Sequence, residues 1–201
     1  MELSKMKMKM KMKMKMKIYG THLIFLSIFL PFTVNATGIE CDKLSTWSNT
    51  YDGMVVNQHH IFCGEPNKNN TKAVGFHSMP DNNPPSTFKS SETSSPENEF
   101  GLYSLKKIVL DFNGLKVEKA FSTMFPTSCT LEQINASAVY SYKNSNGQCK
   151  NVNWATCGPS SPKEDNSKLY CIGKNGKAFT IATATLPNDN TKLNTAFPID
   201  E

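Results

Sequence analysis

The clearest alternation of apolar and polar residues runs over residues 105–112, which read LKKIVLDF and predict a β-strand. Asn113 and Gly114 follow, and a second strand-like run occupies residues 115–121. Asn-Gly suits the two-residue turn of a hairpin, because both turn positions take a positive φ. These residues therefore predict a β-hairpin, which is the strongest hairpin pattern in the chain.

One helix is predicted immediately after this region. Residues 130–133 read TLEQ, a capping box in which the Thr hydroxyl and the Gln side chain satisfy free backbone groups of the first helical turn. Apolar side chains then recur at helical spacing, at Leu131, Ile134, Ala138 and Tyr142. We therefore expect a helix that begins at the capping box.

The remaining pattern predicts more strands joined by loops. Residues 80–98 are rich in Pro, Ser and Asn and predict an irregular exposed loop, and a second loop is expected over residues 144–158. Three further strands are expected, over residues 169–172, 178–185 and 193–199. Strands, one helix and more strands predict a single α+β domain, a largely antiparallel sheet with a helix packed against it.

The first 36 of the 201 residues have the pattern of a signal peptide. Lys alternates with Met up to Lys17, residues 18–34 are mainly apolar, and Val34 and Ala36 place small residues at the −3 and −1 positions of a cleavage site. An uncleaved membrane anchor is the alternative, since 17 residues lie at the short end of spanning length. We expect cleavage, which leaves residues 37–201 as one secreted or periplasmic domain without membrane attachment.

Removal of the leader changes the charge balance. The whole chain has a formal charge of +5, but seven of its 22 basic residues lie in the leader, so residues 37–201 carry 15 Lys against 16 acids. All basic residues are Lys, which excludes bidentate guanidinium clamps on phosphate. This near-neutral balance argues against nucleic-acid binding through bulk charge, and a few placed groups must bind any anion.

All six cysteines lie after the predicted cleavage site. An even number of cysteines in an exported domain predicts up to three disulfides. No C-x-x-C pair occurs, which disfavours a structural zinc site and a thioredoxin-type motif. Pairing each cysteine with its neighbour along the chain predicts the bridges Cys41–Cys63, Cys129–Cys149 and Cys157–Cys171.

The three histidines of residues 37–201 fall close together, at positions 59, 60 and 77. Two imidazoles in one site suit acid–base catalysis near neutral pH, because one can accept a proton while the other donates one. A metal site is a second interpretation, although the separation of His60 and His77 lacks the tight spacing of a helical His pair. Histidines without a shared role are the third.

Four short motifs extend this picture. Residues 60–65 read HIFCGE, residues 73–78 read AVGFHS, residues 121–126 read FSTMFP, and residues 194–198 read NTAFP. Their content and order resemble the EndoU family of RNA endonucleases, in the branch found in bacterial secreted toxins, over about residues 52–199. The resemblance implies an EndoU/RNase A-like nuclease fold with an antiparallel sheet platform, in agreement with the pattern above.

The resemblance also implies catalytic roles. His60 would be the general base that deprotonates the ribose 2′-hydroxyl, and His77 the general acid that protonates the leaving 5′-oxygen. Lys119 would stabilise charge on the phosphate, and Thr195 matches a Thr of the family's closing motif. A solvated strand-end lysine and a strand threonine without a special role are the alternatives for these two residues.

Four more residues are candidates for substrate binding. Ser122 or Thr123 would offer a hydroxyl to phosphate or base. Glu65 stands where animal members have an acid implicated in activity and metal dependence, and a charge that holds a loop is the alternative. Phe197 replaces the Tyr of viral relatives and can pack on a sugar but cannot donate a hydrogen bond, which removes one basis for a uridine preference.

The resulting hypothesis is a secreted endonuclease that cleaves single-stranded RNA by 2′-hydroxyl transesterification. The chemistry requires no metal in principle, and stimulation by Mn²⁺ stays open. We expect a monomer with RNA as its partner, and a cognate inhibitor protein stays open as a further partner. The alternative is a secreted, disulfide-stapled binding module with the same fold and no catalysis.

Overall fold

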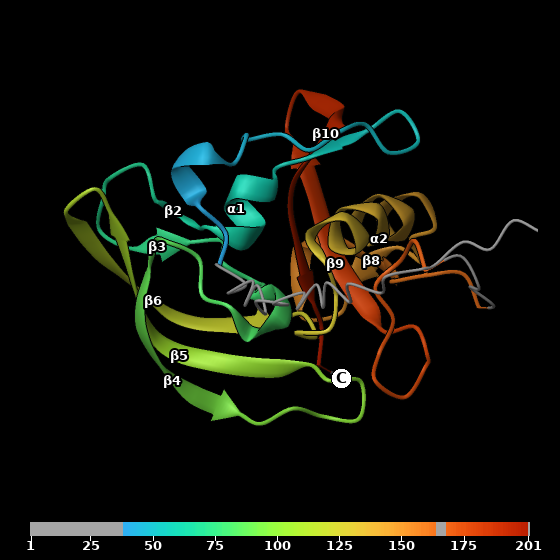
Figure 1. The fold of residues 1–201 in the computed structure, drawn as a ribbon. Coiled ribbons are helices and arrows are strands. Elements are labelled where there is room, and N and C mark those ends of the chain that lie inside the picture. Colours follow the sequence, from blue (N-terminus) through green and yellow to red (C-terminus); the bar gives the residue numbers. More distant parts are fainter. Residues whose placement is uncertain (1–37, 164–167, 201) are drawn as a thin grey trace, which may run out of the picture. The chain divides into compact units, whose positions relative to one another are not determined.

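The structure is a computed structural model that describes residues 38–163 and 168–200 (Figure 1). These residues belong to one unit of the chain, Asn35–Glu201. The predicted signal peptide and its cleavage site lie outside the described residues. Within the described residues, no helix is both long and apolar enough to cross a membrane.

The described strands form three sheets. The first contains β4 (Phe88–Ser95), β5 (Tyr103–Phe112) and β6 (Leu115–Met124) in that order. The second has the order β1 (Val55–Val56), β10 (Asp189–Pro198), β9 (Thr180–Leu186), β8 (Val152–Pro159) and β7 (Gln148–Cys149). The third pairs β2 (Glu65–Pro66) with β3 (Ala73–Val74). Only β1 and β10 pair in parallel among these described strands.

The described helices are short except for one. The α-helices are α1 (Gln58–Phe62) and α2 (Leu131–Lys143), and 3₁₀ turns occupy Cys41–Lys43 and Pro80–Asn82. Helix α2 packs against β8 and β9 of the larger sheet, as Figure 1 shows. The fold is therefore α+β with mostly antiparallel sheets and a helix against them, which confirms the predicted fold class.

The predicted hairpin is confirmed. Strands β5 and β6 pair in antiparallel register, and Phe112 lies opposite Leu115. The turn residues Asn113 and Gly114 have φ of 55° and 95°, the positive values that a type I′ turn requires. Strand β6 continues to Met124, three residues beyond the predicted end, so the hairpin carries the FSTMFP motif toward the centre of the domain.

The predicted helix is also confirmed together with its cap. The Thr130 hydroxyl accepts a hydrogen bond from the Gln133 amide at 3.2 Å, and the Gln133 side chain accepts one from the Thr130 amide at 2.9 Å. Ile134 and Ala138 are fully buried on the face toward the sheet. The capping box and the apolar spacing were sufficient here because both signals are local.

Three predicted segments were wrong. Residues 80–98 contain β4, a polar edge strand that pairs only with β5 and so needs little apolar patterning. Residues 144–158, predicted as a loop, contain β7 and most of β8. Residues 169–172, predicted as a strand, form none: Leu169 and Ile172 are 47% and 37% exposed. The strands predicted over 178–185 and 193–199 correspond to β9 and β10.

Two predicted disulfides were wrong as well. The bridge Cys41–Cys63 is present, but Cys129 pairs with Cys171 and Cys149 with Cys157. Helix α2 explains the change, because the backbone amide of Cys171 donates to the hydroxyl of Ser137 in that helix at 2.8 Å. The chain therefore returns to the start of α2, where Cys129 lies, while Cys149 and Cys157 close the β7–β8 hairpin.

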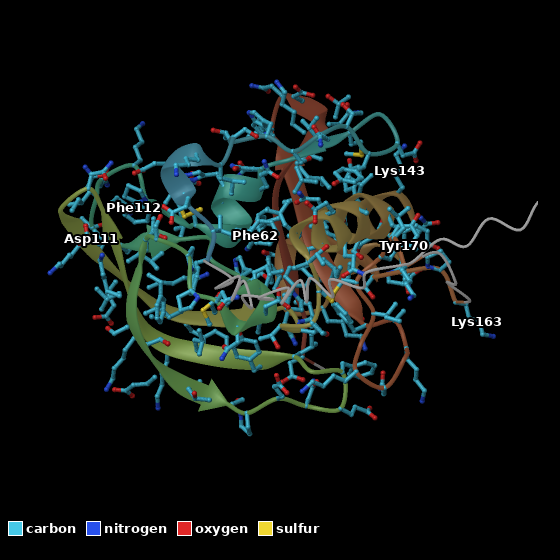
Figure 2. The ribbon with its side chains drawn as sticks, viewed as in Figure 1. Phe62, Asp111, Phe112, Lys143, Lys163 and Tyr170 are labelled. Carbon is cyan, nitrogen blue, oxygen red and sulfur yellow. A yellow bond between two sulfur atoms is a disulfide. The ribbon has the colours of Figure 1, made fainter. Side chains whose placement is uncertain are left out.

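Two apolar clusters form most of the core. The first joins α1, α2 and the larger sheet and includes Phe62, labelled in Figure 2, with Ile134 and Ile181. The second, which includes Phe76 and Met124, lies on the three-stranded sheet. Residues of both clusters come from the segment around α1 and β3, so this segment connects the two sheets and carries the three histidines.

Candidate active site

The first histidine is fixed by a short capped helix. The Asn57 side chain caps α1 by accepting a hydrogen bond from the His60 amide at 3.1 Å. Cys63 ends the helix, and its disulfide to Cys41 ties this end of α1 to the preceding segment. His60 is 7% exposed, and its Nδ1 lies 2.7 Å from the Glu65 carboxylate.

The second histidine lies against the backbone of the same helix. The amides of Phe76 and His77 donate to the carbonyls of His60 and Ile61 at 2.7 and 2.6 Å. Gly75 permits this approach because its φ is +73° and a Cβ there would collide with the His60 carbonyl. The two imidazole centroids therefore lie 6.4 Å apart, although the residues are separated by 17 positions.

His77 has neutral and cationic neighbours. Its Nδ1 lies 3.1 Å from the Thr123 carbonyl and 3.0 Å from the Ser122 hydroxyl, so a proton on Nδ1 is donated there and Nε2 keeps a lone pair. Burial holds the pKa of His77 well below its usual value, and the nearby Lys119 and His60 lower it further. These surroundings favour the neutral imidazole of His77 over the imidazolium.

Lys119 is held at the same point by three groups. Its ammonium donates to the Gly75 carbonyl and to the Ser122 hydroxyl, the latter at 2.9 Å, and lies 3.4 Å from Nε2 of His77. Burial lowers the pKa of Lys119 to about 7, since the charged form is poorly solvated. A poorly solvated cation of this kind is stabilised most when an anion enters the site.

The partner of His60 has the opposite character. The hydrogen bond from His60 holds the pKa of Glu65 below its usual value, against the raising effect of partial burial. The ionised form of Glu65 is therefore favoured, and its Oε1 lies 2.7 Å from Nδ1 of His60. One histidine thus faces an anion and the other a cation.

These groups line one cleft of about 980 Å³ between the edge of β6 and the strands β8 and β10. All eight residues predicted for the site line it: His60, Glu65, His77, Lys119, Ser122, Thr123, Thr195 and Phe197. The structure brings them together, and their individual roles stay predictions. His59, the third histidine, lies outside this lining.

The smaller candidates differ in what they present to the cleft. Ser122 is 2% exposed and donates to the Phe76 carbonyl at 2.7 Å, so its hydroxyl is already engaged with the protein. Thr195, on β10, is 6% exposed. Phe197, two residues further along, stacks its ring on the His77 ring at 5.2 Å between centroids. Ser122 and Phe197 therefore hold His77 in place from two sides.

Sequence reasoning missed two aromatic residues of the cleft. Trp154 on β8 is 61% exposed and Phe121 on β6 is 50% exposed, and both line the cleft. Trp154 lies in a segment predicted as a loop, where no local pattern marks it. Phe121 opens the FSTMFP motif and ends the strand predicted over residues 115–121, and this position was the signal available in the sequence.

The described residues offer no obvious metal site. Within residues 38–163 and 168–200, no three His, Cys, Asp or Glu side chains gather closely enough to hold a metal ion. In the cleft, Glu65 is already the hydrogen-bond partner of His60. The metal requirement of the chemistry stays a prediction.

Comparison with known proteins identifies a family. The sequence model of a family described as bacterial EndoU nuclease matches residues 55–200. Neither the curated proteins nor the solved structures compared with the chain match it. The matched region contains both histidines, Lys119 and the whole cleft.

Proposed function

Because this chain belongs to the bacterial EndoU nuclease family, we propose that it is a secreted endoribonuclease that cleaves single-stranded RNA by transesterification. The observation that carries the proposal is the meeting of His60, His77 and Lys119 in one cleft, with the two imidazoles 6.4 Å apart. A fold retained only for binding has no need for two histidines and a buried lysine at one point.

The proposed reaction uses the substrate's own hydroxyl. The ribose 2′-oxygen attacks the adjacent phosphorus, the bond to the 5′-oxygen of the next nucleotide breaks, and a 2′,3′-cyclic phosphate and a 5′-hydroxyl result. Since the attack is intramolecular, the protein contributes alignment, proton transfer and stabilisation of charge. Two histidines and one cation match these three tasks.

The environments of the histidines favour an assignment opposite to the one that the resemblance implied. The lowered pKa of His77 favours its neutral form, and with the Nδ1 proton directed at the Thr123 carbonyl its Nε2 lone pair faces Lys119 at 3.4 Å. We assign His77 the role of general base, in which the substrate 2′-hydroxyl takes the place of Lys119 as the partner of Nε2. His60 faces an ionised carboxylate that balances an imidazolium, so we assign it the role of general acid on the 5′-oxygen.

Lys119 is proposed to stabilise the negative charge that develops on the phosphate. Its ammonium lies beside His77 and is poorly solvated, so an entering phosphate replaces missing solvation with a charge-assisted hydrogen bond. The same phosphate would raise the pKa of both Lys119 and His77, and so stabilise the imidazolium that His77 becomes. Thr123 and Thr195 line the cleft as the remaining candidates for phosphate or base contacts.

Two further parts of the proposal concern the protein's surroundings. Three disulfides fit an oxidising compartment, in agreement with the predicted export signal. We propose a monomer that requires no resident metal, and digestion of RNA in the presence of EDTA, then of added Mn²⁺, tests the metal requirement. A cognate inhibitor protein stays a prediction, and co-purification with the native protein tests it.

Replacing one sugar of a short RNA tests the proposed chemistry. With a single 2′-deoxy nucleotide immediately 5′ of the main cut site, cleavage at that bond should fall below detection, because no nucleophile remains. An enzyme that activates water would still cut there. Continued cutting at the deoxy position therefore overturns the proposal, and a deoxy sugar two nucleotides away serves as the control.

A sulfur substitution tests the assignment of the two histidines. When the leaving 5′-oxygen is replaced by sulfur, departure no longer needs protonation. His60→Ala should then recover most of its lost rate on the sulfur substrate, while His77→Ala should not. The reverse result supports the original assignment with His60 as base.

A further inference from the structure

The cleft has an unusual distribution of exposed aromatic rings. Among the described residues, five large hydrophobic side chains are exposed: Leu115, Phe121, Trp154, Leu169 and Ile172. Only two of the five are aromatic, and both of these line the cleft that contains the histidines. The other three lie outside it. Scattered exposed hydrophobics are ordinary, but two aromatics beside one reaction centre are not scattered.

The two rings come from different sheets that border the cleft. Phe121 lies on β6, the edge strand of the three-stranded sheet, two residues after Lys119. Trp154 lies on β8 of the five-stranded sheet. A ligand bound at the histidines therefore lies in a cleft to which each of the two sheets contributes one exposed ring.

Trp154 is connected to the reaction centre through a series of packed rings. Its indole lies 5.8 Å from the ring of Phe197, which in turn stacks on His77 at 5.2 Å. Strand β9 separates β8 from β10, and its small residue Ala182 lies opposite Phe197. Phe197 is thus occupied by His77 and Trp154, and the indole is the outer, accessible ring of the series.

We propose that Trp154 and Phe121 are stacking platforms for two unpaired bases, one on each side of the scissile phosphate. Aromatic rings bind unpaired bases of any sequence because every base has a π-face. Bases inside a duplex are already stacked and cannot reach such platforms. The ligand is therefore a single-stranded RNA segment that offers a base on both sides of the cut.

The ring series also indicates which base each platform receives. His77, as the proposed general base, lies at the ribose whose 2′-hydroxyl reacts. Trp154 lies two ring spacings from His77. Trp154 therefore receives the base of that nucleotide, and Phe121 on the other sheet receives the base of the next one. This inference rests on the proposed function, and it predicts weak selectivity for base identity together with strong selectivity against duplexes.

Chimeric substrates with abasic positions test the proposal. A deoxy oligonucleotide with one ribonucleotide can be cut only on the 3′ side of that ribonucleotide. A stable abasic sugar can replace either the ribonucleotide itself, with its 2′-hydroxyl kept, or the nucleotide that follows it. On the complete substrate, Trp154→Ala and Phe121→Ala should each lower kcat/KM about tenfold to hundredfold. The exposed Leu115, on the same strand as Phe121, gives the matched control Leu115→Ala, which should change kcat/KM less than twofold.

The decisive result is the loss of each effect on the matching abasic substrate. Trp154→Ala should have no further effect when the nucleotide that carries the 2′-hydroxyl is abasic, and Phe121→Ala none when the next nucleotide is abasic. An equal effect of either variant on complete and abasic substrates overturns the proposal, as does efficient cleavage of a perfect duplex by the wild type. Unchanged melting temperatures establish that the variants are folded.

A binding measurement separates this proposal from the proposed function. Trp47→Phe leaves Trp154 as the only tryptophan, since the chain has two. An all-deoxy oligonucleotide, which cannot be cut, should quench its fluorescence, and an oligonucleotide that is abasic throughout should not. If quenching occurs but no RNA is cut, the proposed function fails and stacking stands. If RNA is cut without base-dependent quenching, the stacking proposal fails alone.

Discussion

His60 and His77 are the same residue type in one cleft, yet their surroundings differ in nearly every respect. His60 belongs to a capped helix, is tied by the Cys41–Cys63 disulfide and faces an ionised carboxylate. His77 lies in an extended segment between a backbone carbonyl, a hydroxyl, a phenyl ring and an ammonium group. A histidine's own chemistry therefore does not assign its role, because its neighbours decide which protonation state it holds.

The largest expected fall in the cleavage rate follows the removal of either imidazole ring. His60→Ala and His77→Ala should each lower cleavage of a short RNA by about 10²–10⁴-fold, the usual range for a positioned acid or base. His59→Ala is the matched control, because His59 neighbours His60 but does not line the cleft. Initial rates with all three proteins would check this, and an equal loss from His59→Ala would mean that the wrong histidine of the pair was chosen.

Lys119, the cation beside His77, should increase activity but decrease stability. Lys119→Met should lower kcat about 10–10³-fold through loss of charge stabilisation, yet raise the melting temperature by about 2–4 °C, because a poorly solvated cation is removed. A lowered melting temperature at neutral pH would contradict this account.

The stability gained by Lys119→Met should change with pH in a direction set by the pKa of Lys119. The pKa of Lys119 is about 7 in the folded protein and higher in the unfolded chain, so above pH 7 the unfolded chain binds the extra proton. The wild type should therefore gain stability as pH rises from about 7 toward the usual lysine range, and the advantage of Lys119→Met should shrink over that interval. Thermal unfolding at several pH values measures it.

The Cys41–Cys63 disulfide, next to His60, should affect activity more than the Cys129–Cys171 disulfide, although the two should contribute similar amounts of stability. Replacing both Cys41 and Cys63 with Ser, or both Cys129 and Cys171, should each remove about 3–4 kcal/mol of stability, given sequence separations of 22 and 42. Only the first pair holds the end of α1, so only its loss should also lower kcat of the folded protein. Rates below the unfolding transition distinguish the two.

The smallest expected effect belongs to the carboxylate partner of His60. Glu65→Gln keeps an oxygen for the Nδ1 hydrogen bond and removes the charge, so kcat/KM should fall about three- to tenfold. Because Glu65 acts through His60, the loss should disappear on the substrate with a 5′-sulfur leaving group. A loss that persists there would show that Glu65 does not act through protonation of the leaving group.

Prediction from the sequence succeeded in the β5–β6 hairpin and failed over residues 144–172. In the hairpin, alternation and the Asn113-Gly114 turn are encoded by neighbouring residues, and the prediction was confirmed. Over residues 144–172 the predicted strand at 169–172 and the loop predicted before it were both wrong. What happens there depends on α2 and on the disulfides, which no short window contains.

The site shows the same division. Its eight predicted residues could be named in advance because seven lie in four motifs whose order matches a known family and the eighth, Lys119, lies two residues before the third motif; the cleft contains all of them. The protonation of His77 could not be named, because it arises from burial and from Lys119, 42 residues away. Trp154 was missed for the same reason, since its contact with Phe197 joins two strands 43 residues apart.

The sequence by itself determined the family, the fold class, the capped helix, the hairpin and eight of the residues that line the cleft. These depend on local patterns and on motif order, which are written along the chain. Only the tertiary structure decided the disulfide pairing, the opposite electrostatic surroundings of His60 and His77, and the series of rings that ends in Trp154. Each of these depends on distances between residues far apart in sequence, and such distances exist only once the chain has folded.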